Sequence, residues 1–153
     1  MPEVGKKIPA LKGRTGDDAE LKLSSLKGQW LVIYFYPKDS TPGCTTEAGQ
    51  FRDLHEQFQK LGCDVFGVSR DGLKSHQSFK AKLELPFELL VDADEIACTL
   101  FGVVKMKKLY GKEVRGIERS TFLIDAAGVL RREWRAVRAD GHAAEVLAAV
   151  ESL

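Results

Sequence analysis

Hydrophobic residues fall into runs and stripes that predict a strand followed by a helix in the first half of the chain. Residues 30–36 (WLVIYFY) form a continuous apolar run, rich in β-branched and aromatic types, that ends at Pro37. Such a run is typical of a strand buried on both faces. After a polar stretch, apolar side chains recur at three- and four-residue spacing up to Gly62, which puts them on one face of a helix. These side chains are Phe51, Leu54, Phe58 and Leu61.

The same alternation continues through the middle of the chain. Residues 63–69 predict a second strand, and a helical pattern over residues 73–83 leads to a third strand at residues 87–91. A short helix is expected around residues 96–101. Strands that alternate with helices in this way predict an α/β sheet.

The remaining segments predict a terminal hairpin and a closing helix. Residues 121–124 and 129–134 flank the turn sequence DAAG, which favours a β-hairpin, and residues 142–152 carry the apolar stripe of a helix. The basic stretch over residues 104–119 shows no clear period and is interpreted as the longest loop. Near the N-terminus, where glycines and prolines punctuate the chain, residues 21–23 suggest a small strand.

This order of elements is that of a thioredoxin-like fold. We therefore expect an α/β architecture in which a central mixed β-sheet is flanked by helices, with an N-terminal hairpin extension, in a single domain over residues 1–153. The length of 153 residues and the hydrophobic share of 44% suit one core of this size. A fold alone does not assign a function, so the chemistry has to come from particular residues.

The balance of charges argues against polyanionic and lipid partners. With 23 basic and 22 acidic residues the net charge is +1, and the longest apolar run is far shorter than the ~20 residues of a membrane-spanning helix. We expect no nucleic acid, no membrane and a cytoplasmic location. The basic residues between positions 105 and 115 are interpreted as a solvated loop. His55, His76 and His142 are interpreted as surface residues, and together with the cysteines they show no metal-ligand spacing.

Cys44 is the residue whose position suggests chemistry. The chain has three cysteines, at positions 44, 63 and 98, and this odd number leaves at least one thiol unpaired within the chain. Cys44 lies where the first helix is predicted to begin, and the free N–H groups and partial positive charge of a helix N-terminus stabilise a thiolate. Pro42 stiffens this turn, and Gly43 permits close approach of the backbone. These neighbours favour a nucleophilic thiolate over the alternative, a buried and inert cysteine.

Blocks of sequence around this cysteine and further along the chain are specific enough to indicate a family. Residues 35–47 read FYPKDSTPGCTTE and contain the pattern PxxxTxxC, residues 110–112 read YGK, and residues 116–125 read GIERSTFLID. With these blocks the chain resembles the peroxiredoxins, and within them the bacterioferritin comigratory protein (PrxQ-like) subfamily. The resemblance implies a thioredoxin-like fold in which a peroxidatic Cys44 reduces hydrogen peroxide and alkyl hydroperoxides in antioxidant defence. It implies no metal and no organic cofactor.

The resemblance also gives roles to side chains around the thiol. The Thr41 hydroxyl is expected to hydrogen-bond the thiolate or the peroxide, in addition to or instead of capping the helix. Arg119 is expected to stabilise the Cys44 thiolate and hold the peroxide, although from sequence alone an exposed arginine is the commoner outcome. Pro37 is expected to wall the pocket, or simply to end the strand. Glu47 is expected to fix Arg119 by an ion pair, or to serve only as a first-turn acid.

The route by which Cys44 is reduced after each turnover is where the chain departs from its relatives. A second, resolving cysteine often lies five residues further along, but here that position is Gly49, and residues 73–83 contain no cysteine. Cys63 is interpreted as a packing residue, which leaves Cys98 as the possible internal resolver. We favour a one-cysteine cycle in which an external thiol such as thioredoxin, glutaredoxin or glutathione restores Cys44. The protein is expected to be a monomer or a weak homodimer.

Two rival functions share the predicted fold. A thiol-disulfide oxidoreductase normally shows CxxC at the start of this helix, and here Thr41 occupies the first cysteine position; the cis-proline expected near the active site is also missing from residues 118–121. A redox-inert binding module leaves the combination of Thr41, Cys44 and Arg119 unexplained. Peroxide chemistry explains all three residues.

Overall fold

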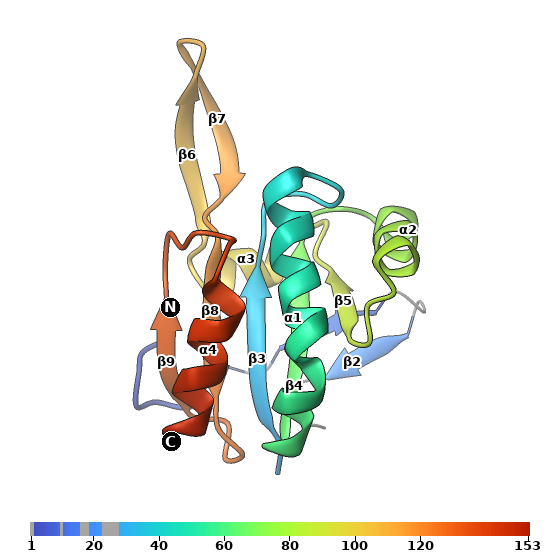
Figure 1. Cartoon of the computed structure of the whole chain (residues 1–153). Helices are drawn as coiled ribbons and strands as arrows, with labels where there is room; N and C mark the ends of the chain where they lie inside the picture. The colour runs from blue at the N-terminus through green and yellow to red at the C-terminus, as the bar shows by residue number, and fades with distance from the viewer. Residues whose placement is uncertain (1, 10, 16–18, 23–27) are drawn as a thin grey trace.

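The computed structural model places a mixed β-sheet at the centre of the molecule (Figure 1). The structure describes residues 2–9, 11–15, 19–22 and 28–153. Across these residues the sheet has seven strands in the order β2-β1-β5-β4-β3-β8-β9. Their bounds are β1 Lys12–Arg14, β2 Glu20–Lys22, β3 Trp30–Phe35, β4 Cys63–Ser69, β5 Glu88–Val91, β8 Ser120–Ile124 and β9 Leu130–Trp134. The four helices of this part of the chain are α1 Pro42–Lys60, α2 Leu73–Leu83, α3 Ile96–Leu100 and α4 His142–Glu151.

The central strands run parallel and the outer ones antiparallel. β3 pairs in parallel with β4, and β4 with β5, because each of these connections passes through a helix. β8 pairs antiparallel with β3 and with β9, and the short β1 and β2 form an antiparallel hairpin beside β5. The expected mixed sheet with flanking helices and an N-terminal hairpin is therefore confirmed.

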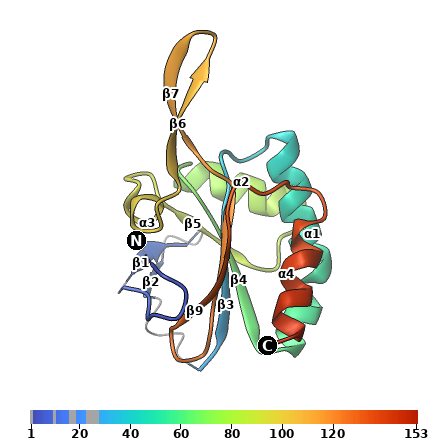
Figure 2. The same cartoon turned by 90° about the vertical axis from the view of Figure 1, so that its left-hand side faces the viewer.

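The two faces of the sheet carry separate hydrophobic clusters. Along β3, Val32 and Tyr34 pack into a cluster with side chains of α1, α2 and α4, whereas Ile33 and Phe35 pack into a cluster that includes α3. Figure 2 shows α1 and α4 on one side of the sheet and α3 on the other. Because successive side chains of a strand point to opposite faces, a strand covered on both sides reads as a continuous apolar run. This explains the predicted run at residues 30–36.

The interpretation of residues 104–119 as a loop is wrong. The structure has a two-stranded hairpin there, β6 Val104–Leu109 and β7 Lys112–Ile117, which projects beyond the sheet (Figures 1 and 2). Tyr110 and Gly111 both have positive φ, at 52° and 76°, as a tight two-residue hairpin turn requires. Most of the described hairpin side chains are exposed, so neither face imposes an apolar alternation on the sequence.

The interpretation of the histidines as surface residues is wrong for two of the three. His76 and His142 are 0% and 3% exposed, while His55 is half-buried. His76 contacts Asp39 and the Leu90 carbonyl, and His142 contacts Thr121 and Glu145. A histidine is buried at little cost when both ring nitrogens find partners, and residues distant in the sequence supply those partners here. None of the helices in the described ranges is long and apolar enough to cross a membrane.

Gly67 on β4 lies where no side chain fits. A Cβ at this position would come within 2.8 Å of Tyr34 and of Leu89 on the neighbouring strands. Gly67→Ala is therefore expected to lower the free energy of unfolding by about 1–3 kcal/mol, measured by urea denaturation. Gly49→Ala on α1 is the control, because its Cβ would meet nothing nearer than the Arg52 side chain at 3.7 Å and alanine favours a helix. Equal stability of the two variants would contradict the tight packing at Gly67.

Candidate active site

Cys44 lies in the first turn of α1, directly after the loop that follows β3. The helix begins at Pro42, whose fixed φ suits a first helical position. The Cys44 side chain is buried, at 1% exposure, within the cluster under α1. The predicted position of this thiol at the start of the first helix is confirmed.

Arg119 reaches the same helix start from the opposite end of the sequence. It precedes β8, and the antiparallel pairing of Ser120 with Phe35 brings it to the end of β3 from which the loop leads to α1. Arg119 Nη2 donates to Cys44 Sγ at 3.4 Å, and Arg119 Nη1 donates to Glu47 Oε1 at 2.7 Å. The fold thus places one guanidinium between a thiol and a carboxylate that lie on neighbouring turns of α1.

The Glu47–Arg119 pair is largely shielded from water. The Glu47 side chain is fully buried and the Arg119 side chain is 15% exposed. Burial raises the pKa of Glu47 to about 7, although the Arg119 charge and hydrogen bond lower it. Burial lowers the pKa of Arg119, but the neighbouring Glu47 and Cys44 raise it by more than burial lowers it. The net shift is upward, so Arg119 stays cationic. A fixed positive charge therefore faces the sulfur.

Gly43, Thr41 and Pro37 occupy the turn around the thiol. A Cβ on Gly43 would lie 3.1 Å from Arg119 Nη2, so glycine lets the guanidinium approach the helix start. The Thr41 hydroxyl makes no helix-capping hydrogen bond; it donates to the Lys38 carbonyl oxygen at 2.8 Å. Pro37 is half-buried between β3 and this turn. Among the described contacts, none places its ring against the sulfur.

The other two cysteines lie away from Cys44, and all three thiols are free. Cys63 begins β4 and pairs with Trp30, at the end of the sheet opposite to the start of α1. Its burial, followed by the charge of Asp64, raises its pKa to about 12. Cys98 packs on the other face of the sheet from Cys44, and burial, together with Asp92, raises its pKa well above the usual value. The structure brings neither thiol to Cys44.

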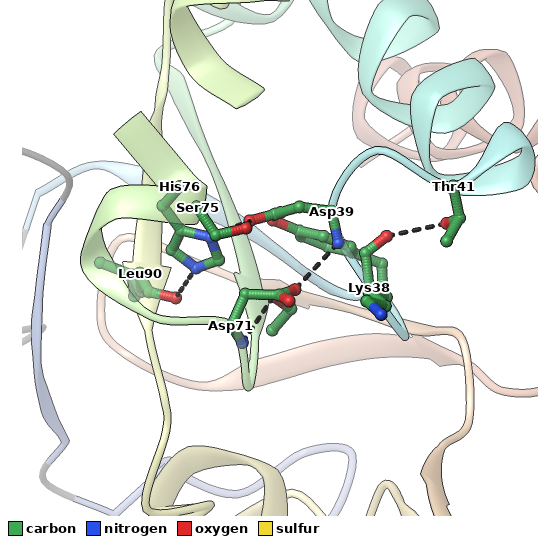
Figure 3. A network of polar contacts seen from close by, with 9 residues as sticks. Lys38, Asp39, Thr41, Asp71, Ser75, His76 and Leu90 are labelled. Carbon is green, nitrogen blue, oxygen red and sulfur yellow. Dashed lines mark hydrogen bonds and ion pairs between the residues drawn. The ribbon is translucent and has the colours of Figure 1, made fainter. Parts of the chain in front are cut away.

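Asp39 and His76 form a buried contact beside the active-site loop that the sequence did not reveal. Asp39 lies within the motif that contains Cys44, but its partner is 37 residues away on α2. Asp39, Asp71 and His76 each place one potential metal-ligand atom within 4.8 Å of the others. Their ligand atoms already exchange hydrogen bonds with protein groups, so the arrangement is a hydrogen-bond network (Figure 3).

Comparison with known proteins adds a family match to this description of the site. The family model described as AhpC/TSA family matches residues 4–133. Peroxiredoxin Bcp of Bacillus subtilis is 50% identical over 151 residues, which cover 99% of this chain and 96% of the relative. A solved structure of Xylella fastidiosa PrxQ has 42% identity and a TM-score of 0.95, covering 99% of this chain and 97% of that one.

A second solved structure belongs to a protein with a described activity. The Xanthomonas campestris bacterioferritin comigratory protein, described for its alkyl peroxide reduction activity, has 46% identity and a TM-score of 0.92, with 98% of each chain covered. The thioredoxin-like fold expected from the element order is thereby confirmed. The chain therefore belongs to the AhpC/TSA family, as a peroxiredoxin of the bacterioferritin comigratory protein (PrxQ) subfamily, and is a thiol-dependent peroxidase.

Proposed function

We propose that Cys44 is the peroxidatic cysteine and that Arg119 and Thr41 act with it on the peroxide. The observation that carries this proposal is the Arg119 guanidinium at 3.4 Å from Cys44 Sγ, fixed from behind by the buried Glu47. Cys63 and Cys98 are buried beside carboxylates, which disfavour a thiolate. Cys44 instead lies in the first turn of a helix, with the permanently charged Arg119 guanidinium at 3.4 Å from its sulfur.

The reaction moves negative charge from sulfur to oxygen. The Cys44 thiolate attacks the terminal oxygen of the hydroperoxide, so that an S–O bond forms and the O–O bond breaks. The products are a sulfenic acid at Cys44 and an alkoxide or hydroxide, which takes a proton from water. Arg119 donors fixed at the site stabilise this charge without reorganising. Neither a metal nor a further redox group takes part in these steps.

Thr41 acts as a hydrogen-bond acceptor in this proposal. Its hydroxyl proton is directed to the Lys38 carbonyl oxygen, which leaves the lone pairs of Thr41 Oγ1 to accept the O–H of a hydroperoxide. A peroxide held in this way by Thr41 and by Arg119 has its terminal oxygen turned toward the sulfur. Pro37 and Gly43 support the site by shaping the turn and by admitting the guanidinium.

We propose that an external thiol completes the cycle. The sulfenic acid condenses with this thiol to give a mixed disulfide and water, and a second thiol releases Cys44 and carries away the disulfide. Thioredoxin, glutaredoxin and glutathione supply this chemistry. The absence of a neighbouring thiol in the described residues supports this route over Cys98, which packs on the other face of the sheet. Three free cysteines suit a reducing compartment such as the cytoplasm. The expected monomer or weak homodimer stays a prediction.

Treatment of the reduced protein with one equivalent of hydrogen peroxide tests both the thiol and its cycle. We expect the intact mass to increase by one oxygen atom, and dimedone to trap a sulfenic acid that peptide mapping assigns to Cys44. Because Cys98 packs on the other face of the sheet from Cys44, no loss of two hydrogens is expected. A mapped Cys44–Cys98 disulfide would contradict the one-cysteine cycle but not the peroxidase. Oxidation at Cys63 or Cys98 with Cys44 unmodified would contradict the proposed role of Cys44.

A further inference from the structure

A buried polar network ties the loop before α1 to helix α2 (Figure 3). Its centre is the Asp39 side chain, which is 1% exposed. Asp39 Oδ1 accepts a hydrogen bond from the Tyr36 hydroxyl at 2.6 Å. Asp39 Oδ2 accepts from the Ser75 hydroxyl at 2.8 Å and from His76 Nδ1 at 2.7 Å. One carboxylate thus joins the end of β3, the loop and α2.

The hydrogen bonds of His76 define its protonation state. Nδ1 faces the Asp39 carboxylate at 2.7 Å, and Nε2 faces the Leu90 carbonyl oxygen at 2.8 Å. The Leu90 carbonyl oxygen can only accept, and so can the Asp39 carboxylate while it is ionised. With an ionised Asp39, both ring nitrogens therefore donate and His76 is an imidazolium. Burial lowers the pKa of His76, but the hydrogen bond and the charge of Asp39 raise it by more, so the net shift is upward. Burial raises the pKa of Asp39, but hydrogen bonds from His76 and Tyr36 lower it by more, so the net shift is downward.

Asp39 also fixes the backbone of the loop that leads to Cys44. Its N–H donates to Asp71 Oδ2 at 2.9 Å, beyond the end of β4. The next residue, Ser40, has a φ of 62°, a left-handed conformation that is unfavourable for a residue with a side chain. Thr41 then donates its hydroxyl proton back to the Lys38 carbonyl. The bonds of Asp39 therefore hold the residues on either side of it in a conformation that the loop alone does not favour.

We propose that Asp39 and His76 are positioning residues for peroxide reduction, and that their buried carboxylate–imidazolium contact holds residues 38–41 so that Thr41 can receive a peroxide in line with Cys44. Neither residue is placed at the reacting atoms; both act through the loop. The inference rests on the proposed roles of Thr41 and Cys44, and it assigns to α2 a part in the activity of a thiol on α1.

The charge on His76 gives this contact a pH dependence. The ionisable groups that face His76 are Asp39 in the loop, Asp71 beyond β4 and Tyr36 at the end of β3, and β5 contributes the Leu90 carbonyl. Folding raises the pKa of His76, so His76 stabilises the folded protein most when it is protonated. This contribution to folding stability is complete below the pKa of the unfolded chain, about 6.5, and is lost as the pH rises through the pKa of the folded protein. Folding lowers the pKa of Asp39, so its stabilisation is lost only as the pH falls through that lowered value.

Stopped-flow kinetics of the variants Asp39→Asn and His76→Asn test the proposal, with two reactions measured on each. We expect the second-order rate constant for hydrogen peroxide to fall about 10- to 100-fold because the loop is misplaced. Alkylation of Cys44 by iodoacetamide needs the thiolate but not a positioned peroxide, so it should change less than about threefold. His142→Asn, which removes another buried histidine of the same core, is the control for lost stability and should leave both reactions nearly unchanged.

The wild-type protein supplies a second test if a variant does not fold. Nitrogen NMR of the His76 ring should show both nitrogens protonated below about pH 6.5, since folding raises its pKa above that value. The ratio of the peroxide rate to the alkylation rate should fall as His76 loses its proton. The proposal would be overturned by a neutral His76 ring, or by a ratio of the two rates that stays constant while His76 loses its proton. It would also be overturned if His76→Asn kept the wild-type peroxide rate. Parallel loss of both reactions would also overturn it. Full activity of Cys44→Ser would instead remove the proposed function itself.

Discussion

Replacement of Cys44 by serine is expected to abolish the reduction of hydrogen peroxide and alkyl hydroperoxides. The second-order rate constant should fall by about 10³-fold or more, because a serine hydroxyl stays protonated and is a far weaker nucleophile than a thiolate. Arg119 would still face the position of the sulfur, but a charge at this distance cannot ionise a hydroxyl. Stopped-flow measurement of peroxide consumption under single-turnover conditions gives the rate constant directly.

The remaining cysteines provide matched controls for this substitution. Cys63→Ala and Cys98→Ala each remove a buried thiol from one of the two hydrophobic clusters, so both should lose stability, by about 1 kcal/mol, while the peroxide rate stays near the wild-type value. Urea denaturation of every variant separates a loss of folding from a loss of chemistry. Consumption of peroxide by Cys44→Ser at the wild-type rate, or its loss in Cys98→Ala, would assign the reaction to another thiol.

The sequence predicted those elements that bury at least one face. β3 reads as an apolar run because Val32 and Ile33 enter different clusters, and α1 reads as a helix because Phe51 and Phe58 pack under it. The β6–β7 hairpin has no such face, and its backbone pairing of Val104 with Ile117 leaves no mark in the order of polar residues. The hairpin is held together by its tight turn and by the backbone hydrogen bonds between its two strands, and neither requires alternating apolar side chains.

The same distinction applies to the site. Cys44 and Arg119 lie in recognisable motifs, so the resemblance alone pairs two residues that are 75 positions apart in the sequence. Asp39 lies inside that motif, yet nothing in the sequence indicates that His76 is its partner. Burial of a charged side chain depends on which group meets it in space, and the sequence pattern of an amphipathic helix assigns a lone histidine to the surface by default. Only the three-dimensional structure joins α2 to the active-site loop.

Arg119→Ala is expected to have the second largest effect, a decrease of about 10²- to 10³-fold in the rate constant for peroxide. The variant loses the donor at 3.4 Å from Cys44 Sγ, and it also leaves the carboxylate of Glu47 buried without its cation. Arg119→Lys should recover only part of the rate, because an ammonium is a compact point charge and lacks the rigid planar fork with which the guanidinium reaches Glu47 and Cys44 at once. Arg131→Ala, which removes an arginine paired with Asp125 elsewhere on the sheet, is the control and should keep the wild-type rate.

Glu47→Gln separates the position of Arg119 from the charge behind it. The glutamine oxygen can still accept the bond that Glu47 Oε1 accepts from Arg119 at 2.7 Å, but it brings no negative charge. Burial raises the pKa of Glu47 to about 7 against the effect of Arg119, so the wild-type carboxyl is largely protonated at lower pH and ionised at higher pH. The peroxide rates of the variant and the wild type should therefore converge below pH 7 and separate above it. Identical pH profiles would mean that Glu47 positions Arg119 through its hydrogen bond alone, whereas a uniform loss at every pH would mean that the glutamine fails to hold Arg119.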